Sequence, residues 1–281
     1  MPAALRFPLG GEPAYWARLA GENALALFLV LLLALLVVTA LAWRVLHRIA
    51  VPRQESALPP WLFLVVRAGL GFALIVGGAA VFAGIADALD ADEELATLDH
   101  AFTQALAGSV PRPVLHLFAG LTRLADTATL VALGAGVALA LVARGRLGLA
   151  LGWTVAIGGN GLLNVSLKAV FQRVRPLHDD GMVLASGFSF PSGHSSGSVV
   201  ACGMLAYLAL RLLPPRWHLP VVLLAAALAF GIGASRAFLR VHFASDVVAG
   251  FASGLAWLAV CVTSIELTRA YRRRAIPPTS T

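Results

Sequence analysis

The sequences K-A-V-F-Q-R-V-R-P at residues 168–176, P-S-G-H at 191–194 and S-R-A-F-L-R-V-H-F-A-S-D at 235–246 decide how this chain is organised. They gather a lysine, several arginines, two histidines and a carboxylate at the ends of apolar segments. Ionisable side chains next to membrane segments are costly without partners, and they commonly mark functional sites. We therefore interpret the three motifs as parts of one anion-binding site at a membrane surface.

The composition is that of a protein that crosses a membrane several times. The 281 residues are 59% hydrophobic and 12% charged, with a mean hydropathy of +0.84, whereas soluble domains carry about 25% charged residues. The net charge of +7 would also suit a nucleic-acid-binding protein. The arginines, however, cluster in short connections between apolar runs, as the positive-inside rule predicts. We therefore expect a lipid bilayer around the chain and no nucleic-acid partner.

Seven apolar runs are long enough, or nearly so, to cross a hydrocarbon layer of about 30 Å. The predicted spans are 24–43, 61–86, 127–143, 149–167, 194–213, 219–238 and 246–266. Arginines follow the first, third, fifth and seventh runs, which places those ends in the cytoplasm. All three motifs then fall on the opposite, non-cytoplasmic side.

The segment between the second and third predicted spans differs in character from the rest of the chain. Residues 87–99 are rich in aspartate and glutamate, and we interpret them as an acidic connection on the non-cytoplasmic side. Residues 101–125 are amphipathic and are interrupted by Pro111 and Pro113. Because proline disrupts a helix interior, this pattern predicts one or two surface helices.

Three parts of the chain follow from this division. Residues 1–58 form an N-terminal part with an interfacial segment, anchored by Tyr15 and Trp16, and one transmembrane helix. Residues 59–268 form the core, and residues 269–281 form a basic cytoplasmic tail.

The two cysteines, Cys202 and Cys261, both lie inside apolar runs. There they are expected as small buried side chains and not as a disulfide or metal site.

The first motif contains Lys168, the only lysine of the chain. Lysine and arginine differ in reach and donor geometry, so this exception indicates a position where a compact ammonium group is needed. The alternative is a lysine at a helix end that faces lipid headgroups. Two helical turns separate Lys168 from Arg175, so a continuous helix would place both on one face. Arg173 would point elsewhere, and we interpret it as a headgroup contact.

The second motif predicts an anion cradle at the start of a helix. Ser192 can cap the helix or donate its hydroxyl, and Gly193 allows backbone N–H groups to approach an anion closely. His194 follows, and its side chain can donate or accept a proton near neutral pH. The alternative is an ordinary helix cap with an incidental histidine.

The third motif places His242 and Asp246 four residues apart, after Ser235 and Arg236. On a helix this spacing sets the carboxylate beside the imidazole, where it can hold the proton of one nitrogen and leave the other as a nucleophile. Asp246 at the mouth of a span would be expensive to bury without such a partner.

Together the pattern K-x6-R-P, P-S-G-H and S-R-x5-H-x3-D resembles the type 2 phosphatidic acid phosphatase (PAP2) superfamily, which also includes the vanadium-dependent haloperoxidases. The resemblance covers about residues 60–268 and includes Pro176, Pro191 and Ser235 as signature positions. It implies an all-α fold: a polytopic membrane helical bundle with a six-span PAP2-like core. The first predicted span is then an extra N-terminal helix.

The resemblance also implies a role for each site residue. The phosphate is expected to bind Lys168, Arg175, Ser192, the amide of Gly193 and Arg236. His242 is expected to attack phosphorus, Asp246 to orient His242, and His194 to protonate the departing oxygen. No metal and no other cofactor are expected, because the positive side chains neutralise the phosphate charge.

The implied activity is that of a metal-independent membrane lipid phosphatase that works through a phosphohistidine intermediate at the non-cytoplasmic face. Undecaprenyl or another polyprenyl diphosphate, phosphatidic acid and phosphatidylglycerol phosphate are all compatible substrates. Three alternatives remain: a lipid phosphotransferase with the same site, a vanadate-dependent haloperoxidase, and a non-catalytic lipid-binding or transport protein that has kept the pocket.

Overall fold

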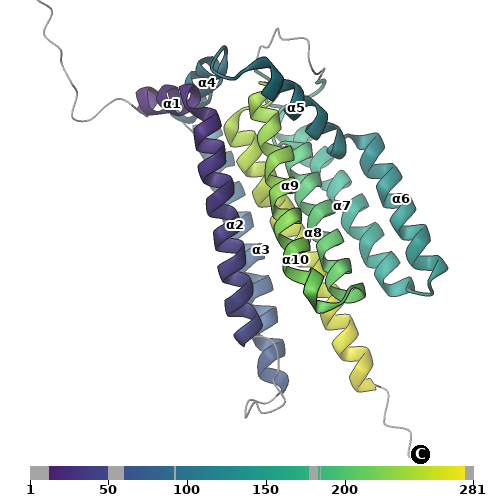
Figure 1. The fold of residues 1–281 in the computed structure, drawn as a ribbon. Coiled ribbons are helices and arrows are strands. Elements are labelled where there is room, and N and C mark those ends of the chain that lie inside the picture. Colours follow the sequence, from purple (N-terminus) through teal and green to yellow (C-terminus); the bar gives the residue numbers. More distant parts are fainter. Residues whose placement is uncertain (1–12, 50–59, 92, 177–182, 184, 276–281) are drawn as a thin grey trace, which may run out of the picture.

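The fold of the chain is that of a helical bundle. A computed structural model describes residues 13–49, 60–91, 93–176, 183 and 185–275. Within these residues there are ten α-helices, two short 3-10 turns and no strand, which confirms the predicted all-α membrane bundle (Figure 1). The elements are α1 (Pro13–Glu22), α2 (Ala24–Ile49), α3 (Pro60–Ala91), α4 (Glu93–Leu106), α5 (Arg112–Thr122), η1 (Arg123–Ala125), α6 (Thr127–Ala143), α7 (Leu147–Phe171), α8 (Gly193–Leu212), η2 (Pro215–Trp217), α9 (His218–Phe238) and α10 (Ala244–Ala275).

Five of the helices, α2, α3, α8, α9 and α10, are long and apolar enough to cross a membrane. A sixth crossing results if the segment 112–125 and α6, which meet at a bend of 46°, are taken together. Helix α7 runs beside α6 and α8 in the bundle (Figure 1). The sequence G-G-N-G at 158–161 interrupts its apolar character, so the count of seven spans stays a prediction.

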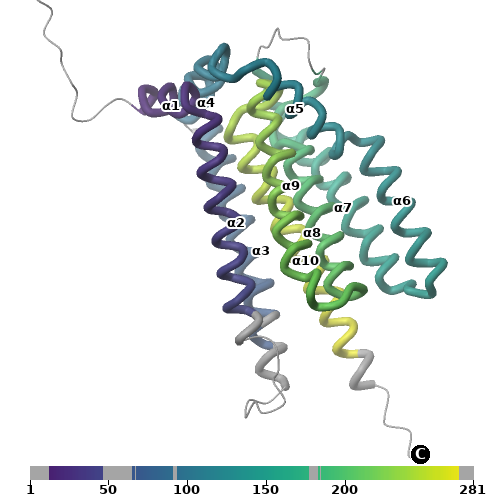
Figure 2. Tube along the Cα trace, in the orientation of Figure 1, coloured from purple at the N-terminus to yellow at the C-terminus, as the bar shows by residue number. Residues whose placement is uncertain are grey.

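The short helices α1, α4 and α5 lie across one end of the bundle, opposite the connections from α6 to α7 and from α8 to α9 (Figure 2). The predicted surface helices in 101–125 correspond to the end of α4 and to α5, which begins directly after Pro111. The acidic segment 87–99 is not an open connection. Asp87 and Asp90 belong to the end of α3, and Asp99 lies in α4 with only 4% of its surface exposed.

The N-terminal helices pack against the rest of the bundle. Helix α2 packs along α9, where the ring of Phe28 stacks on Phe230 and meets Phe118 edge-on. Residues 1–12 and 50–58 of the predicted N-terminal part and residues 276–281 of the predicted tail lie outside the described residues. The division into three parts therefore stays a prediction.

The largest core cluster lies between α7, α8 and α10. Trp153, Val200 and Met204 are fully buried in it, and the indole of Trp153 donates a hydrogen bond to the carbonyl of Gly134 at 2.9 Å. Cys261 is buried in the same cluster, as predicted, whereas Cys202 is partly buried; both are free thiols.

Glycines on α10 allow its backbone to approach the start of α8. A Cβ atom at Gly250 would lie 2.5 Å from the carbonyl oxygen of Ser192, and one at Gly254 would lie 2.8 Å from that of Ser196. Small residues of this kind bring membrane helices into direct backbone contact. This contact sets the start of α8 against the first turns of α10, which is where the second and third motifs meet.

We expect Gly250→Ala to destabilise the protein, because its methyl group meets a backbone oxygen that cannot rotate away. A loss of about 1 kcal/mol lowers Tm by about 2–4 °C in domains of 150–250 residues. Gly84→Ala is the matched control, because a Cβ at this position of α3 has nothing within 4 Å and alanine favours a helix. Thermal unfolding of the detergent-solubilised variants measures both. A Gly250→Ala protein as stable as Gly84→Ala would contradict the helix contact.

Candidate active site

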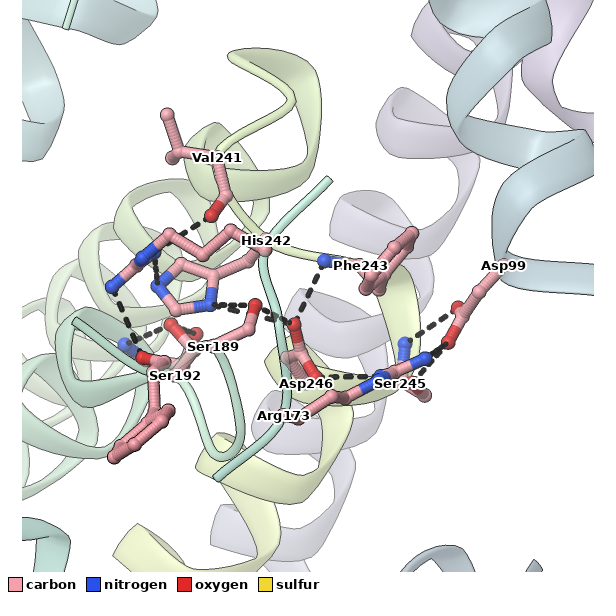
Figure 3. Close-up of polar contacts among 12 residues, drawn as sticks. Asp99, Arg173, Ser189, Ser192, Val241, His242, Phe243, Ser245 and Asp246 are labelled. Carbon is pink, nitrogen blue, oxygen red and sulfur yellow. Dashed lines mark hydrogen bonds and ion pairs between the residues drawn. The ribbon is translucent and has the colours of Figure 1, made fainter. Parts of the chain in front are cut away.

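The centre of the site is His242, which lies in the turn between α9 and α10 with 2% of its surface exposed. Its Nδ1 is 3.5 Å from Oδ2 of Asp246, in the first turn of α10. The hydroxyl of Ser189 bridges the pair: its oxygen lies 3.2 Å from Nδ1 and donates to Oδ2 of Asp246 at 2.5 Å (Figure 3). The carboxylate is therefore linked to the imidazole mainly through a serine that lies just before the second motif.

The second oxygen of Asp246 faces an arginine. Nη1 of Arg173 donates to Oδ1 at 2.7 Å, and Nη2 of the same guanidinium donates to Asp99 of α4 at 2.9 Å. Ser245 fills the space between them, accepting from Arg173 at 2.8 Å and donating its backbone N–H to Asp99 at 3.1 Å (Figure 3). The interpretation of Arg173 as a headgroup contact is therefore wrong, because its guanidinium connects two buried carboxylates.

The two cations of the first motif meet in a way that helix periodicity did not predict. Helix α7 ends at Phe171, and Gln172 follows in the left-handed conformation, so no continuous helix joins Lys168 to Arg175. Both side chains instead donate to the carbonyl of Phe188 in the loop before α8. This shared acceptor brings the ammonium and the guanidinium to the same place.

Arg175 also contacts the candidate nucleophile. Its Nη1 lies 3.0 Å from Nε2 of His242 and donates to the carbonyl of Val241 at 2.7 Å. Its remaining donors bind the carbonyls of Ser186 and Gly187. The nitrogen of His242 that is not directed to Ser189 and Asp246 therefore faces a guanidinium donor.

The second motif forms the start of α8. Ser192 is fully buried and acts as the N-cap: its side-chain oxygen accepts the Ser195 N–H at 3.4 Å and the Ser195 hydroxyl at 2.9 Å. Gly193 packs against α7, where a Cβ would lie 2.8 Å from Oδ1 of Asn164. Nε2 of His194 lies 2.9 Å from Oδ1 of Asp126, at the junction of η1 and α6.

Arg236, in the last turn of α9, is the most deeply buried cation of the site, with 2% of its surface exposed. Its Nη1 donates to the hydroxyl of Thr122 at 2.7 Å, but the buried Nε–H has no hydrogen-bond partner within the described part of the structure. A buried donor on a cation without an acceptor is costly and rare. Its presence indicates a site for an anion.

The structure brings together all eight residues singled out from the sequence. The links run from His242 to Asp246 and Arg175, from Arg175 to Lys168, and from the backbone N–H of Ser192 to the carbonyl of Asp246 at 3.0 Å. Arg236 and Arg175 lie close enough to His194 to repel a positive charge on its ring.

Five further residues were missed by the sequence analysis: Asp99, Thr122, Asp126, Arg173 and Ser189. The position of Ser189 two residues before Pro191 was an available signal. Asp99 lies in the predicted acidic connection, Thr122 in the predicted surface helices, and Asp126 between these helices and the third predicted span. No pattern in the sequence ties them to the motifs.

Burial lowers the pKa of His242 from its ordinary value of 6.5 to about 3. The Asp246 carboxylate acts in the opposite direction, and the positive charge of Arg175 adds to the effect of burial. The imidazole is therefore neutral at physiological pH. A neutral ring has one nitrogen with a free lone pair, which is the form required of a nucleophile.

Comparison with known proteins gives one family. The model of the PAP2 superfamily matches residues 147–269. Lipid A 1-phosphatase of Rhizobium johnstonii is 34% identical over 188 residues, which cover 58% of this chain and 72% of that protein. Phosphatidylglycerophosphatase B of Bacillus subtilis is 39% identical over 103 residues, 36% of this chain, and the chain spans only half of the length of that protein.

A solved structure has the same fold. The crystal structure of a transmembrane PAP2 type phosphatidylglycerolphosphate phosphatase from Bacillus subtilis superposes with a TM-score of 0.61 and 27% sequence identity. The match covers 73% of this chain and 99% of that chain. The resemblance expected from the three motifs is confirmed.

We expect the stability of the protein to fall as the pH decreases from about 6.5 toward 3. In this window the unfolded chain binds a proton at His242 that the folded protein excludes. The free energy of unfolding therefore falls by up to about 1.4 kcal/mol per pH unit. His242→Gln removes this contribution, so its Tm should fall less between pH 7 and pH 5 than that of the wild type. The exposed His116, replaced by Gln, is the control and should retain the wild-type difference. Equal pH dependence of His242→Gln and wild type would contradict a neutral, buried His242.

Proposed function

This chain belongs to the PAP2 superfamily, and from that premise we propose that it hydrolyses a lipid phosphate or diphosphate through a phosphohistidine on His242. It is a multi-pass membrane protein with relatives among the membrane lipid phosphatases. The residues 59–268 would form the catalytic core. The observation that carries the proposal is the unpaired, buried Nε–H of Arg236 beside a neutral histidine.

The phosphate group is proposed to bind among the cations. Arg236 donates its free Nε–H to one phosphate oxygen, and Lys168 and Arg175 neutralise the remaining charge. The N-terminal amides of α8 at Gly193 and His194 add donors at the positive end of the helix dipole. Ser192 contributes by capping α8 and so fixing these amides, as well as by its hydroxyl.

Entry of phosphate would change one contact of the site. Nη1 of Arg175 faces Nε2 of His242 at 3.0 Å, where it would compete with phosphorus for the lone pair. A phosphate oxygen is a stronger acceptor than a neutral imidazole, because its charge strengthens the hydrogen bond. We propose that the guanidinium turns to the phosphate oxygen and that Nε2 is freed by the same movement.

The chemistry then has two steps. The lone pair of Nε2 attacks phosphorus, the bond from phosphorus to the lipid oxygen breaks, and His194 gives its proton to that oxygen. Asp246 and Ser189 hold the Nδ1–H and stabilise the positive charge that develops on the ring. In the second step water attacks the phosphorus–nitrogen bond, His194 takes a proton from the water, and inorganic phosphate leaves with His242 restored.

We infer the class of substrate and the side of the membrane from the position of the site and from the distribution of arginines. A site at the end of a bundle would let a lipid tail stay in the bilayer while its headgroup reaches the cations. Phosphatidylglycerol phosphate, phosphatidic acid, undecaprenyl diphosphate and lipid A 1-phosphate all have this form. The distribution of arginines supports the non-cytoplasmic face. Three cationic side chains at the phosphate, those of Lys168, Arg175 and Arg236, support a reaction that needs no metal ion.

We expect purified protein to release phosphate from at least one of these four lipids in the presence of EDTA, and His242→Ala to lower turnover by at least about 1,000-fold. Loss of the nucleophile removes the covalent route, and comparable losses follow removal of nucleophiles in other enzymes. Phosphate release in mixed micelles is the measurement.

His116→Ala is the control for this experiment, because it removes an exposed histidine that bonds only the carbonyl one turn before it in α5. Its turnover should equal that of the wild type. Undiminished turnover in His242→Ala would contradict the assignment of His242 as the nucleophile. Loss of wild-type activity with EDTA would contradict a metal-independent reaction.

A further inference from the structure

The corner between α5 and α6 forms one wall of the site. The segment 112–125 and α6 meet at 46°, and Asp126 is the residue at the break, with φ −60° and ψ 147°. This extended conformation turns α6 away from the direction of the segment 112–125. It leaves the Asp126 carboxylate beside His194, with Oδ1 2.9 Å from Nε2. Thr122, in the same corner, binds Arg236. This corner therefore supplies partners to two site residues.

Asp126 occupies the N-cap of α6 but does not cap it. Aspartate at this position normally accepts a hydrogen bond from an N–H of the first turn, which stabilises the helix by about 1 kcal/mol. The Asp126 side chain makes no such bond, although its backbone carbonyl accepts the N–H of Leu130 at 2.9 Å. Its carboxylate is committed to His194 instead, so helix capping does not explain the contact.

The charges around His194 suggest what the contact between Asp126 and His194 does. A residue that protonates a leaving oxygen must carry a proton when the substrate is bound. Burial disfavours a positive charge on the His194 ring, and Arg236 and Arg175 repel it. The Asp126 carboxylate offsets that repulsion by accepting the Nε2–H. With Nε2 held in this way, Nδ1 is the nitrogen that remains to serve the leaving group.

We propose that Asp126 is a positioning residue that orients His194 and stabilises its protonated form during departure of the leaving group. The inference rests on the proposed hydrolysis. It assigns the acid step to a pair formed by α8 and the corner before α6, separate from the pair of His242 and Asp246 that serves the attack on phosphorus.

Two matched substrates separate this role from a structural one. In 4-nitrophenyl phosphate the leaving oxygen is a phenolate that needs little protonation, whereas in 4-nitrobenzyl phosphate it is an alkoxide that needs a proton. We expect Asp126→Asn to lower kcat/KM by about 10-fold to 100-fold on the benzyl ester and by less than about 3-fold on the phenyl ester. General acid catalysis contributes a factor of this order or larger.

The double variant supplies a second readout. Because Asp126 acts through His194, Asp126→Asn should cause no further loss on the benzyl ester when added to His194→Gln. Asp90→Asn, which removes an exposed carboxylate at the end of α3, is the control and should behave as the wild type on both esters.

Three results would count against the inference. Equal losses of kcat/KM on both esters in Asp126→Asn would indicate a structural effect. No loss on either ester would show that Asp126 has no role in the reaction. Additive losses with His194→Gln would show that the two residues act independently. Phosphate release by the wild type from neither ester and from none of the lipids would instead overturn the proposed function.

Discussion

The structure depends on the hydrogen bonding of one buried carboxylate at the end of a membrane bundle. Asp246 is fully buried, and a charge in that position is tolerated only where donors surround it. Ser189, the backbone N–H of Phe243 and Arg173 provide those donors, and Arg173 in turn binds Asp99 of α4. This network joins α4, the segments on either side of the loop before α8, and α10. It thereby fixes His242 at the point where these elements meet.

The two faces of the site are built for different tasks. Around Asp246 the charges are paired, so this side is rigid and holds the imidazole of His242 in one orientation. On the other side Arg236 keeps a buried N–H without an acceptor, and Arg175 holds only carbonyl oxygens and a neutral ring. A bound phosphate would complete that second side. The close contact of Gly250 with the start of α8 holds the two sides of the site in a fixed position relative to each other.

The sequence predicted the all-helical bundle and the residues of the three motifs, because apolar length and charge at helix ends are local properties. It did not predict contacts that depend on where the chain turns. Arg173 was assigned to lipid headgroups because helix geometry was extended beyond Phe171, where α7 ends. Asp99 and Asp126 lie 74 and 68 residues from Arg173 and His194, their partners, and only the folded bundle brings them close.

The direct test of the central role of His242 is to trap the intermediate. When the His194→Gln protein is mixed with 4-nitrophenyl phosphate, nitrophenolate should be released rapidly. The phosphoryl enzyme should then hydrolyse slowly, because the imidazole that takes a proton from the attacking water is absent. Quenching in alkali, which preserves phosphohistidine, followed by mass spectrometry of peptides should place the phosphoryl group on His242. A phosphoryl group on another side chain, or a burst of nitrophenolate without any phosphorylated His242, would contradict the mechanism.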